Sequence, residues 1–122
     1  MIEIHPLRDK HKLSQLYKEN DIALTEDSMA IVASDKEEIL GFCLFDLNSK
    51  EGYVHYISPI DDIPFADGLL RSALHVCVEN GVQDVFYTYK SPEKLFETLK
   101  FIKSAEKREL DVTRLFTSCK NC

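Results

Sequence analysis

One stretch, residues 52–81, constrains the fold of this chain more than any other. It opens with GYVHYI, whose β-branched and aromatic side chains are typical of a buried strand. Pro59 and Pro64 then fall within six residues, and neither the interior of a helix nor that of a sheet accepts such a segment. From Phe65 the apolar residues recur at helical spacing until Gly81, a residue that can end a helix in the left-handed conformation. The stretch is therefore predicted to be a strand, a loop and a helix.

The predicted helix should bury one face. Leu70, Leu74 and Cys77 lie three and four residues apart, so their side chains project together and should pack on the sheet. Arg71 and His75 fall on the other side of the helix and should face water.

The rest of the chain predicts further strands around this unit. They are expected at residues 2–7, 29–34, 39–47, 82–89 and 110–117. The segment 39–47 is apolar on both faces except at Asp46, which favours a central strand covered on both sides. Because a helix separates the strand that begins at Gly52 from the one that begins at Val82, a strand–helix–strand crossover should make two strands parallel.

Two more helices are predicted, one on each side of that unit. Asp9 can cap the first, and the polar segment 19–28 after it is predicted to be a loop. Ser91 is the predicted cap of the second, because proline and an acidic residue follow it. The apolar stripe of this late helix runs from Leu95 to Ile102.

The length and order of these elements predict one domain, residues 1–122. The expected fold is of the α/β (α+β) class, with a mixed, mainly antiparallel sheet, one strand–helix–strand crossover and helices on both faces. The net charge is −6, and Lys and Arg are spread thinly, so nucleic acid is not an expected partner. No apolar run approaches the roughly 20 residues of a membrane span. No signal peptide is visible, so a cytoplasmic location is expected.

The four cysteines fall into two groups. Cys43 and Cys77 lie in apolar patterns and should be small buried residues. Cys119 and Cys122 form a single C-x-x-C, whereas a structural zinc site needs about four ligands. We expect these two to be reduced and metal-free, with a metal or disulfide role as the alternative.

Two segments carry a resemblance to a known family. LLRSAL at residues 69–74, which runs on to ENGV, looks like the helix that follows a pyrophosphate-binding loop. LFETLKF at residues 95–101 looks like a late helix usually written L-Y-E-K-L-G-F. Together they resemble the GNAT acetyltransferase family, which uses acetyl-CoA, and the resemblance covers nearly the whole chain.

The resemblance implies where an acetyl-CoA site would lie. Ile57 and Ser58 would hold the acyl carbonyl and the pantetheine arm through their backbone. The start of the following helix would face the pyrophosphate, at Phe65, Ala66, Asp67 and Gly68. The acyl group would pass to an amine of a small molecule or protein, which attacks the thioester directly.

The pyrophosphate loop departs from the family pattern Q/R-x-x-G-x-G/A. Asp61 or Asp62, depending on the alignment, stands at the basic position, and Pro64 stands at the first glycine. A carboxylate repels a pyrophosphate, and proline removes a backbone N–H. Phe96 stands where many members have a tyrosine proposed to protonate the leaving thiolate, and phenylalanine cannot do this.

Three residues are candidates for the chemistry. His55 lies beside the implied acyl site and could take a proton from an amine. The alternative is that His55 is a structural strand residue whose ring nitrogens hydrogen-bond to a neighbouring residue. Tyr87 or Tyr89 could replace the acid missing at Phe96, and both could equally be core residues with a solvated hydroxyl.

Two functions follow from these residues. The first is a divergent acyl-CoA-dependent N-acetyltransferase that moves an acyl group to an amine. The second is a catalytically inactive GNAT-like module that binds a protein or another small ligand. The altered loop favours the second, whereas the family precedent favours the first, because the cofactor contacts that it implies are largely main-chain.

Overall fold

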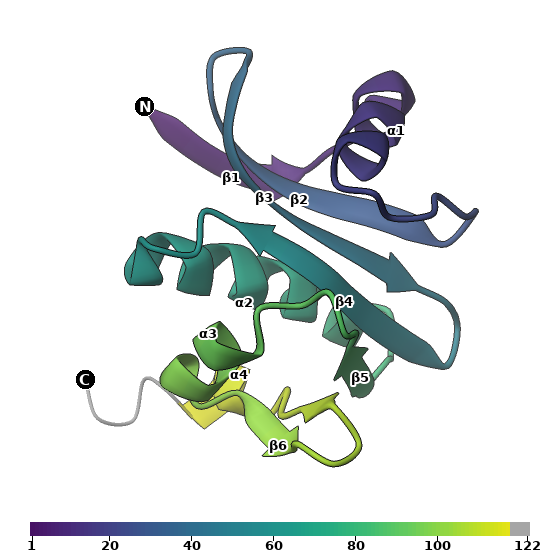
Figure 1. The fold of residues 1–122 in the computed structure, drawn as a ribbon, viewed down its shortest axis with the longest axis vertical. Coiled ribbons are helices and arrows are strands. Elements are labelled where there is room, and N and C mark those ends of the chain that lie inside the picture. Colours follow the sequence, from purple (N-terminus) through teal and green to yellow (C-terminus); the bar gives the residue numbers. More distant parts are fainter. Residues whose placement is uncertain (118–122) are drawn as a thin grey trace.

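The computed structural model describes residues 1–117, and every structural statement below refers to them. Their strands form one sheet in the order β1-β2-β3-β4-β5-β7-β6 (Figure 1). The strands are β1 (Ile2–Pro6), β2 (Ser28–Asp35), β3 (Glu38–Leu47), β4 (Glu51–Ser58), β5 (Asp84–Tyr87), β6 (Ile102–Ser104) and β7 (Glu109–Leu110). The helices are α1 (Lys10–Glu19), α2 (Ile63–Glu79), α3 (Glu93–Leu99) and α4 (Arg114–Thr117).

The sheet is mixed and mainly antiparallel, as predicted. Among the strands of residues 1–117, only β4 and β5 run parallel, and α2 makes the crossover between them. α1 packs on one face and α2 on the other, so the prediction of helices on both faces is confirmed (Figure 1). No helix among residues 1–117 combines the length and the hydropathy that a membrane crossing requires.

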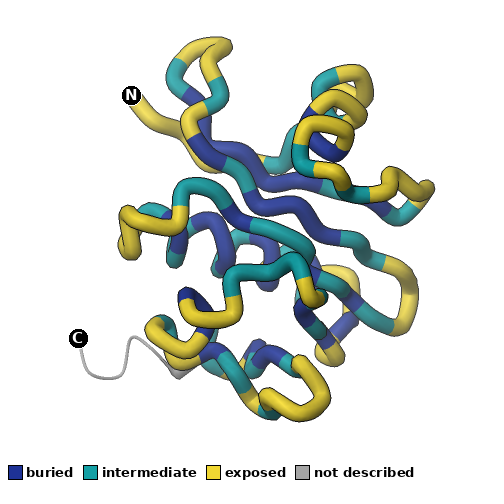
Figure 2. The backbone as a smooth tube through the Cα atoms, in the orientation of Figure 1, coloured by how far each residue is buried: buried dark blue, intermediate teal, exposed yellow. Residues whose placement is uncertain are grey.

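The core lies on both sides of β3, which confirms the prediction of a central covered strand. Leu44 packs with Leu16 and Tyr17 of α1, whereas its neighbours Cys43 and Phe45 belong to the larger cluster beneath α2. Figure 2 shows this buried backbone in the middle strands and along α2. The larger cluster also takes in buried residues of α3 and the last strands, namely Leu95, Phe96, Phe101 and Leu110.

The buried face of α2 matches the prediction, and its outer face matches it only in part. Leu70, Leu74 and Cys77 are at most 1% exposed. His75 faces solvent, with 59% of its side chain exposed. Arg71 does not simply face water, because its guanidinium lies 5.0 Å above the ring of Phe101 and its side chain is only 28% exposed.

The start of α2 also differs from the prediction. The helix begins at Ile63 rather than Phe65, with Asp62 as its N-cap and Pro64 inside its first turn. Proline is tolerated there because the first N–H groups of a helix have no intrahelical acceptor. At the other end Asn80 caps the helix, and Gly81 takes the predicted left-handed conformation with φ of 79°.

The late helix is shorter than predicted at both ends. Its N-cap is Pro92, and Ser91 does not cap it. It ends at Leu99, because Lys100 turns the chain in a left-handed conformation with φ of 62°. Ile102 therefore begins strand β6 instead of extending the apolar stripe of the helix.

The predicted strand over residues 110–117 is wrong for most of its length. β7 stops at Leu110, and Asp111 Oδ1 then accepts a hydrogen bond from the backbone N–H of Thr113 at 3.0 Å. A turn of this kind offers the backbone an alternative to the sheet. The chain continues into the short helix α4, and Cys119 and Cys122 lie outside the described residues.

Candidate functional site

The parallel pair β4 and β5 separates halfway along β4. Their paired positions run from Glu51 with Asp84 to Val54 with Tyr87, whereas β4 continues to Ser58. In the described part of the chain no strand pairs with this edge of β4 beyond Val54. Within the described residues this edge of β4 is therefore unpaired at Ile57 and Ser58, the residues predicted to hold the acyl carbonyl and the pantetheine arm.

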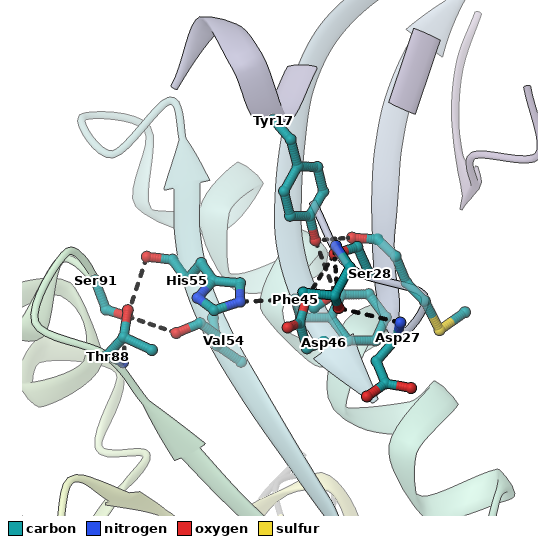
Figure 3. Close-up of polar contacts among 11 residues, drawn as sticks. Tyr17, Asp27, Ser28, Phe45, Asp46, Val54, His55, Thr88 and Ser91 are labelled. Atoms are coloured by element: carbon teal, nitrogen blue, oxygen red, sulfur yellow. Dashed lines mark hydrogen bonds and ion pairs between the residues drawn. The ribbon is translucent and has the colours of Figure 1, made fainter. Parts of the chain in front are cut away.

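His55 occupies the point where the two strands separate. On its other side, Leu44 of β3 pairs with Tyr56 and Phe45 pairs with Val54, so His55 has no partner in β3. Such an extra residue is a β-bulge, which re-aims a side chain relative to the regular alternation of the strand. The bulge directs His55 toward α1 and β3 (Figure 3).

The His55 imidazole lies against a carboxylate. Its Nε2 is 3.3 Å from Oδ1 of Asp46, and the two side chains are only 16% and 21% exposed. Ser28 Oγ donates to the same carboxylate oxygen at 3.0 Å. Partial burial alone would raise the pKa of Asp46, but its contacts with His55, Ser28 and Thr25 lower it overall. Asp46 is therefore a carboxylate held in its charged form beside a histidine.

Tyr17 of α1 closes the inner side of this pair. Its ring meets that of His55 edge-on, with centroids 6.4 Å apart. Its hydroxyl lies 2.7 Å from the carbonyl oxygen of Met29 and 2.9 Å from that of Phe45, so it is engaged with the backbone of the sheet. Burial raises the pKa of Tyr17, which keeps its hydroxyl neutral.

The outer side of His55 lines a cavity of about 620 Å³. Its walls come from the end of α1, the loop after α1 and the loop after β5, through Lys18, Asp21, Ile22, Ala23, Thr88, Tyr89 and Lys90. Lys90 Nζ lies 3.4 Å from Oδ2 of Asp21 and also donates to the Asp21 carbonyl. A second cavity of about 400 Å³ shares Asp21, Ile22 and Lys90 and reaches Tyr56. His55 thus has a charged partner on one side and an open space on the other.

Ser91 closes the beginning of the gap between β4 and β5. Its Oγ donates to the carbonyl oxygens of Val54 and His55, at 2.6 and 3.1 Å, and accepts from the N–H of Thr88 at 2.9 Å (Figure 3). These contacts explain why Ser91 does not cap α3, because its only hydroxyl is already used by β4. The exposed edge of β4 therefore starts at Tyr56.

The start of α2 offers few donors to an anion. Pro64 has no N–H, and Asp62 Oδ1 accepts from the N–H of Phe65 at 3.2 Å. The N–H of Ala66 donates to the Asp62 carbonyl at 2.9 Å, as in any helix. Asp61 and Asp62 add two exposed carboxylates at this helix start. These residues do not fit a diphosphate cradle, which needs free N–H groups and a neutral or basic surrounding.

The residues predicted to face a pyrophosphate through the helix start pack against other parts of the fold. A Cβ at Gly41 would lie 3.0 Å from the Phe65 ring and 2.9 Å from the Ser58 carbonyl oxygen, so both groups pack on β3. Ala66 is fully buried, and Gly68 faces β1, where a Cβ would lie 3.4 Å from Ile4. Asp67 Oδ2 pairs with Arg71 Nε at 2.9 Å.

The two candidate tyrosines lie in different surroundings. Tyr87 is buried and donates to Glu93 Oε2 at 2.5 Å, and burial together with this contact raises its pKa to about 12. Its ring meets Phe96 edge-on, with centroids 5.2 Å apart. Tyr89 is 78% exposed and lines the same cavity as His55. Of the two, Tyr89 is the one placed beside the open side of the histidine.

Sequence reasoning missed several residues of this site, among them Asp46, Lys18 and Lys90. Asp46 stood out as the polar exception in an apolar strand, but its pairing with His55 depends on the bulge in β4. Lys18 and Lys90 come from segments far apart in the chain, and nothing local marks them. Within residues 1–117 no three His, Cys, Asp or Glu side chains group as they would around a metal ion.

No protein-family model and no curated protein sequence matches the chain. Several solved protein structures, however, are similar to the structure of this chain. One is a ribosomal-protein-alanine N-acetyltransferase from Brucella melitensis biovar Abortus, with a TM-score of 0.56 and 18% identity over 81% of this chain and 90% of that one. A second is an aminoglycoside acetyltransferase from an uncultured soil metagenomic sample, in complex with trehalose, with a TM-score of 0.59 and 13% identity over 84% and 88%.

A third similar structure is an acetyltransferase of the GNAT family from Desulfovibrio desulfuricans, with a TM-score of 0.54 and 11% identity over 82% and 83%. The chain has the GNAT fold. In this fold β4 parts from β5 after Val54, bulges at His55, and leads into the start of α2 at Ile63.

Proposed function

We propose that this chain is an N-acyltransferase that moves an acyl group from a thioester to an amine. The observation that carries the proposal is His55, held against Asp46 on one side and open to a cavity of about 620 Å³ on the other. The GNAT fold supports it, since the similar structures include acetyltransferases named for a ribosomal protein and for an aminoglycoside. The proposed acceptor is accordingly an amine of a small molecule or protein.

His55 would act as the general base. The Asp46 carboxylate lies 3.3 Å from Nε2, an ion-pair distance at which the alignment of a hydrogen bond is not met in this structure. A proton on Nε2 beside this carboxylate would leave Nδ1 as the proton acceptor. An amine in the cavity would attack the thioester carbonyl carbon, so that the C–N bond forms as the C–S bond breaks. The proton of the amine passes to His55, and the departing thiolate takes a proton from water. Tyr89 and Thr88 would shape the cavity around the amine.

A non-catalytic binding module is the second candidate function, and two observations favour it. Ser91 binds the carbonyl oxygens of Val54 and His55, which withdraws part of the β4 edge from any ligand. Phe96 is buried against Tyr87 and has no group that can donate a proton. Under this reading the cavity beside His55 would bind a ligand without chemistry.

The experiment that separates the two functions is a thiol-release assay with acetyl thioesters and a panel of amines. Wild-type protein should release thiol in an amine-dependent way, and His55→Ala should lower kcat by about 10²–10⁴-fold, the range for loss of a general base. His75→Ala is the matched control, because His75 is exposed on α2 and should leave the rate unchanged. Absence of thiol release above the uncatalysed background would favour the binding module. Amine-independent release would indicate thioester hydrolysis instead of acyl transfer to an amine, and equal rates for wild type and His55→Ala would refute the role of His55.

A further inference from the structure

We propose that the acyl donor of this chain is a thioester whose thiol carries no diphosphate, such as an acylated pantetheine, rather than acetyl-CoA. This inference rests on the proposed acyl transfer and names its donor. It follows from the disagreement between the start of α2 and the cofactor that the GNAT fold implies. Three features of that helix start lead to it.

The first feature is that the first turn of α2 leaves few N–H donors for a ligand. Of the first-turn positions of α2, Pro64 has no N–H and Phe65 donates to the Asp62 carboxylate. The helix start thus already holds an anionic group, supplied by its own N-cap. A diphosphate would have to displace this carboxylate and would gain few N–H groups in return.

The second feature is the charge of the segment. Residues 57–70 contain Asp61, Asp62 and Asp67 and no Lys or Arg. The next basic residue, Arg71, is paired with Asp67 and lies over the ring of Phe101. A diphosphate placed at this helix start would therefore meet carboxylates of its own sign, and the segment supplies no cation to offset them.

The third feature is the apolar surface of the loop. Ile60 is 48% exposed and Ile63 is 38% exposed, on either side of the two carboxylates. Apolar side chains at this position suit the uncharged end of a thiol arm better than a diphosphate. The open edge of β4, which starts at Tyr56, can still pair with the amide groups of such an arm, as an extended peptide pairs with a strand.

The test compares acetyl-CoA with S-acetylpantetheine, and coenzyme A with pantetheine. We expect kcat/KM values for the two donors within about threefold, because the nucleotide part contributes no net binding. Calorimetric titration should likewise give coenzyme A no advantage over pantetheine. Tighter binding or faster transfer by 30-fold or more with the nucleotide-bearing ligands would overturn the inference.

A variant sharpens this comparison. Asp62→Gly combined with Pro64→Gly removes the internal carboxylate and restores an N–H, so it should raise the preference for coenzyme A about tenfold. Should that variant fail to fold, the ratios of kcat/KM and of binding affinity measured with the wild-type protein still decide whether the inference holds. Binding of pantetheine and coenzyme A with equal affinity but without transfer would refute the proposed acyl transfer, whereas the conclusion that the diphosphate adds nothing to binding would stand. Failure of both to bind at millimolar concentration would refute the inference as well.

Discussion

At the scale of single residues, the contact between Asp46 and His55 predicts how the free energy of unfolding depends on pH. The pKa of Asp46 is lowered in the folded protein. A lowered pKa stabilises the fold above the ordinary pKa of an aspartate, near 3.9, and this stabilisation is lost as the pH falls through the folded value. Acidification from pH 5 to below 4 should therefore reduce the free energy of unfolding.

The corresponding variant is Asp46→Asn, which keeps the shape of the side chain and removes its charge. It should lower the free energy of unfolding by about 1 kcal/mol at pH 7 and should flatten the acid dependence, because the titrating group is gone. Urea melts between pH 3 and 7 measure both effects. Asp84→Asn is the control at an exposed aspartate, and an equal flattening there would refute the assignment to Asp46.

Some residues of the site could be predicted from the sequence, and others could not. His55 stands out in a strand by type alone, and its place beside the open edge of β4 follows from the fold resemblance. Its carboxylate partner does not, because a bulge shifts the register between β3 and β4 and only the folded sheet shows which side chains then meet. Ser91 shows the opposite error: a serine before proline and glutamate is a strong cap signal, yet two carbonyl groups of β4 take its hydroxyl.

At the scale of elements, three substitutions in α2 test which of its residues face the core and which face solvent. Leu74→Ala should cost about 2–5 kcal/mol, because Leu74 is fully buried and the change leaves a cavity. His75→Ala should stay within about 0.5 kcal/mol. Arg71→Ala should fall between them at about 1 kcal/mol, from its contacts with Phe101 and Asp67. Urea melts of the three variants measure the order, and a loss for Arg71→Ala equal to that for Leu74→Ala would contradict this phase.

Elements were predictable where a periodic apolar pattern is long and were missed where a single backbone conformation decides. The seventeen residues of α2 and the covered strand β3 carry such patterns. The end of α3 depends on Lys100, which adopts a left-handed conformation without being a glycine or an asparagine. β6 and β7 have three and two residues, too few for any alternation to show.

At the scale of the whole molecule, the larger core cluster joins strands β2 to β5 to the last elements of the chain. β7 contributes only two pairs to β5, at Val85 with Leu110 and at Phe86 with Glu109. Backbone pairing this short would not hold β6, β7 and α3 to the rest of the sheet. The side chains do, since Phe96, Phe101 and Leu110 are at most 1% exposed and share one cluster with α2.

This arrangement predicts that the C-terminal elements unfold together with the rest of the chain. Leu110→Ala should lower the free energy of unfolding by about 2–5 kcal/mol and leave a single transition, because the cavity opens in the cluster that β7 shares with α2, α3 and strands β2 to β5. Far-UV circular dichroism follows the helices, and tyrosine absorbance, measured in a background where the other four tyrosines are replaced by phenylalanine, follows the packing of Tyr87 against Phe96. The two signals should report the same midpoint in wild type and variant. If tyrosine absorbance changed first, with the circular dichroism of α2 still intact, β7 and its neighbours would form a separate unit and the shared core would not couple them.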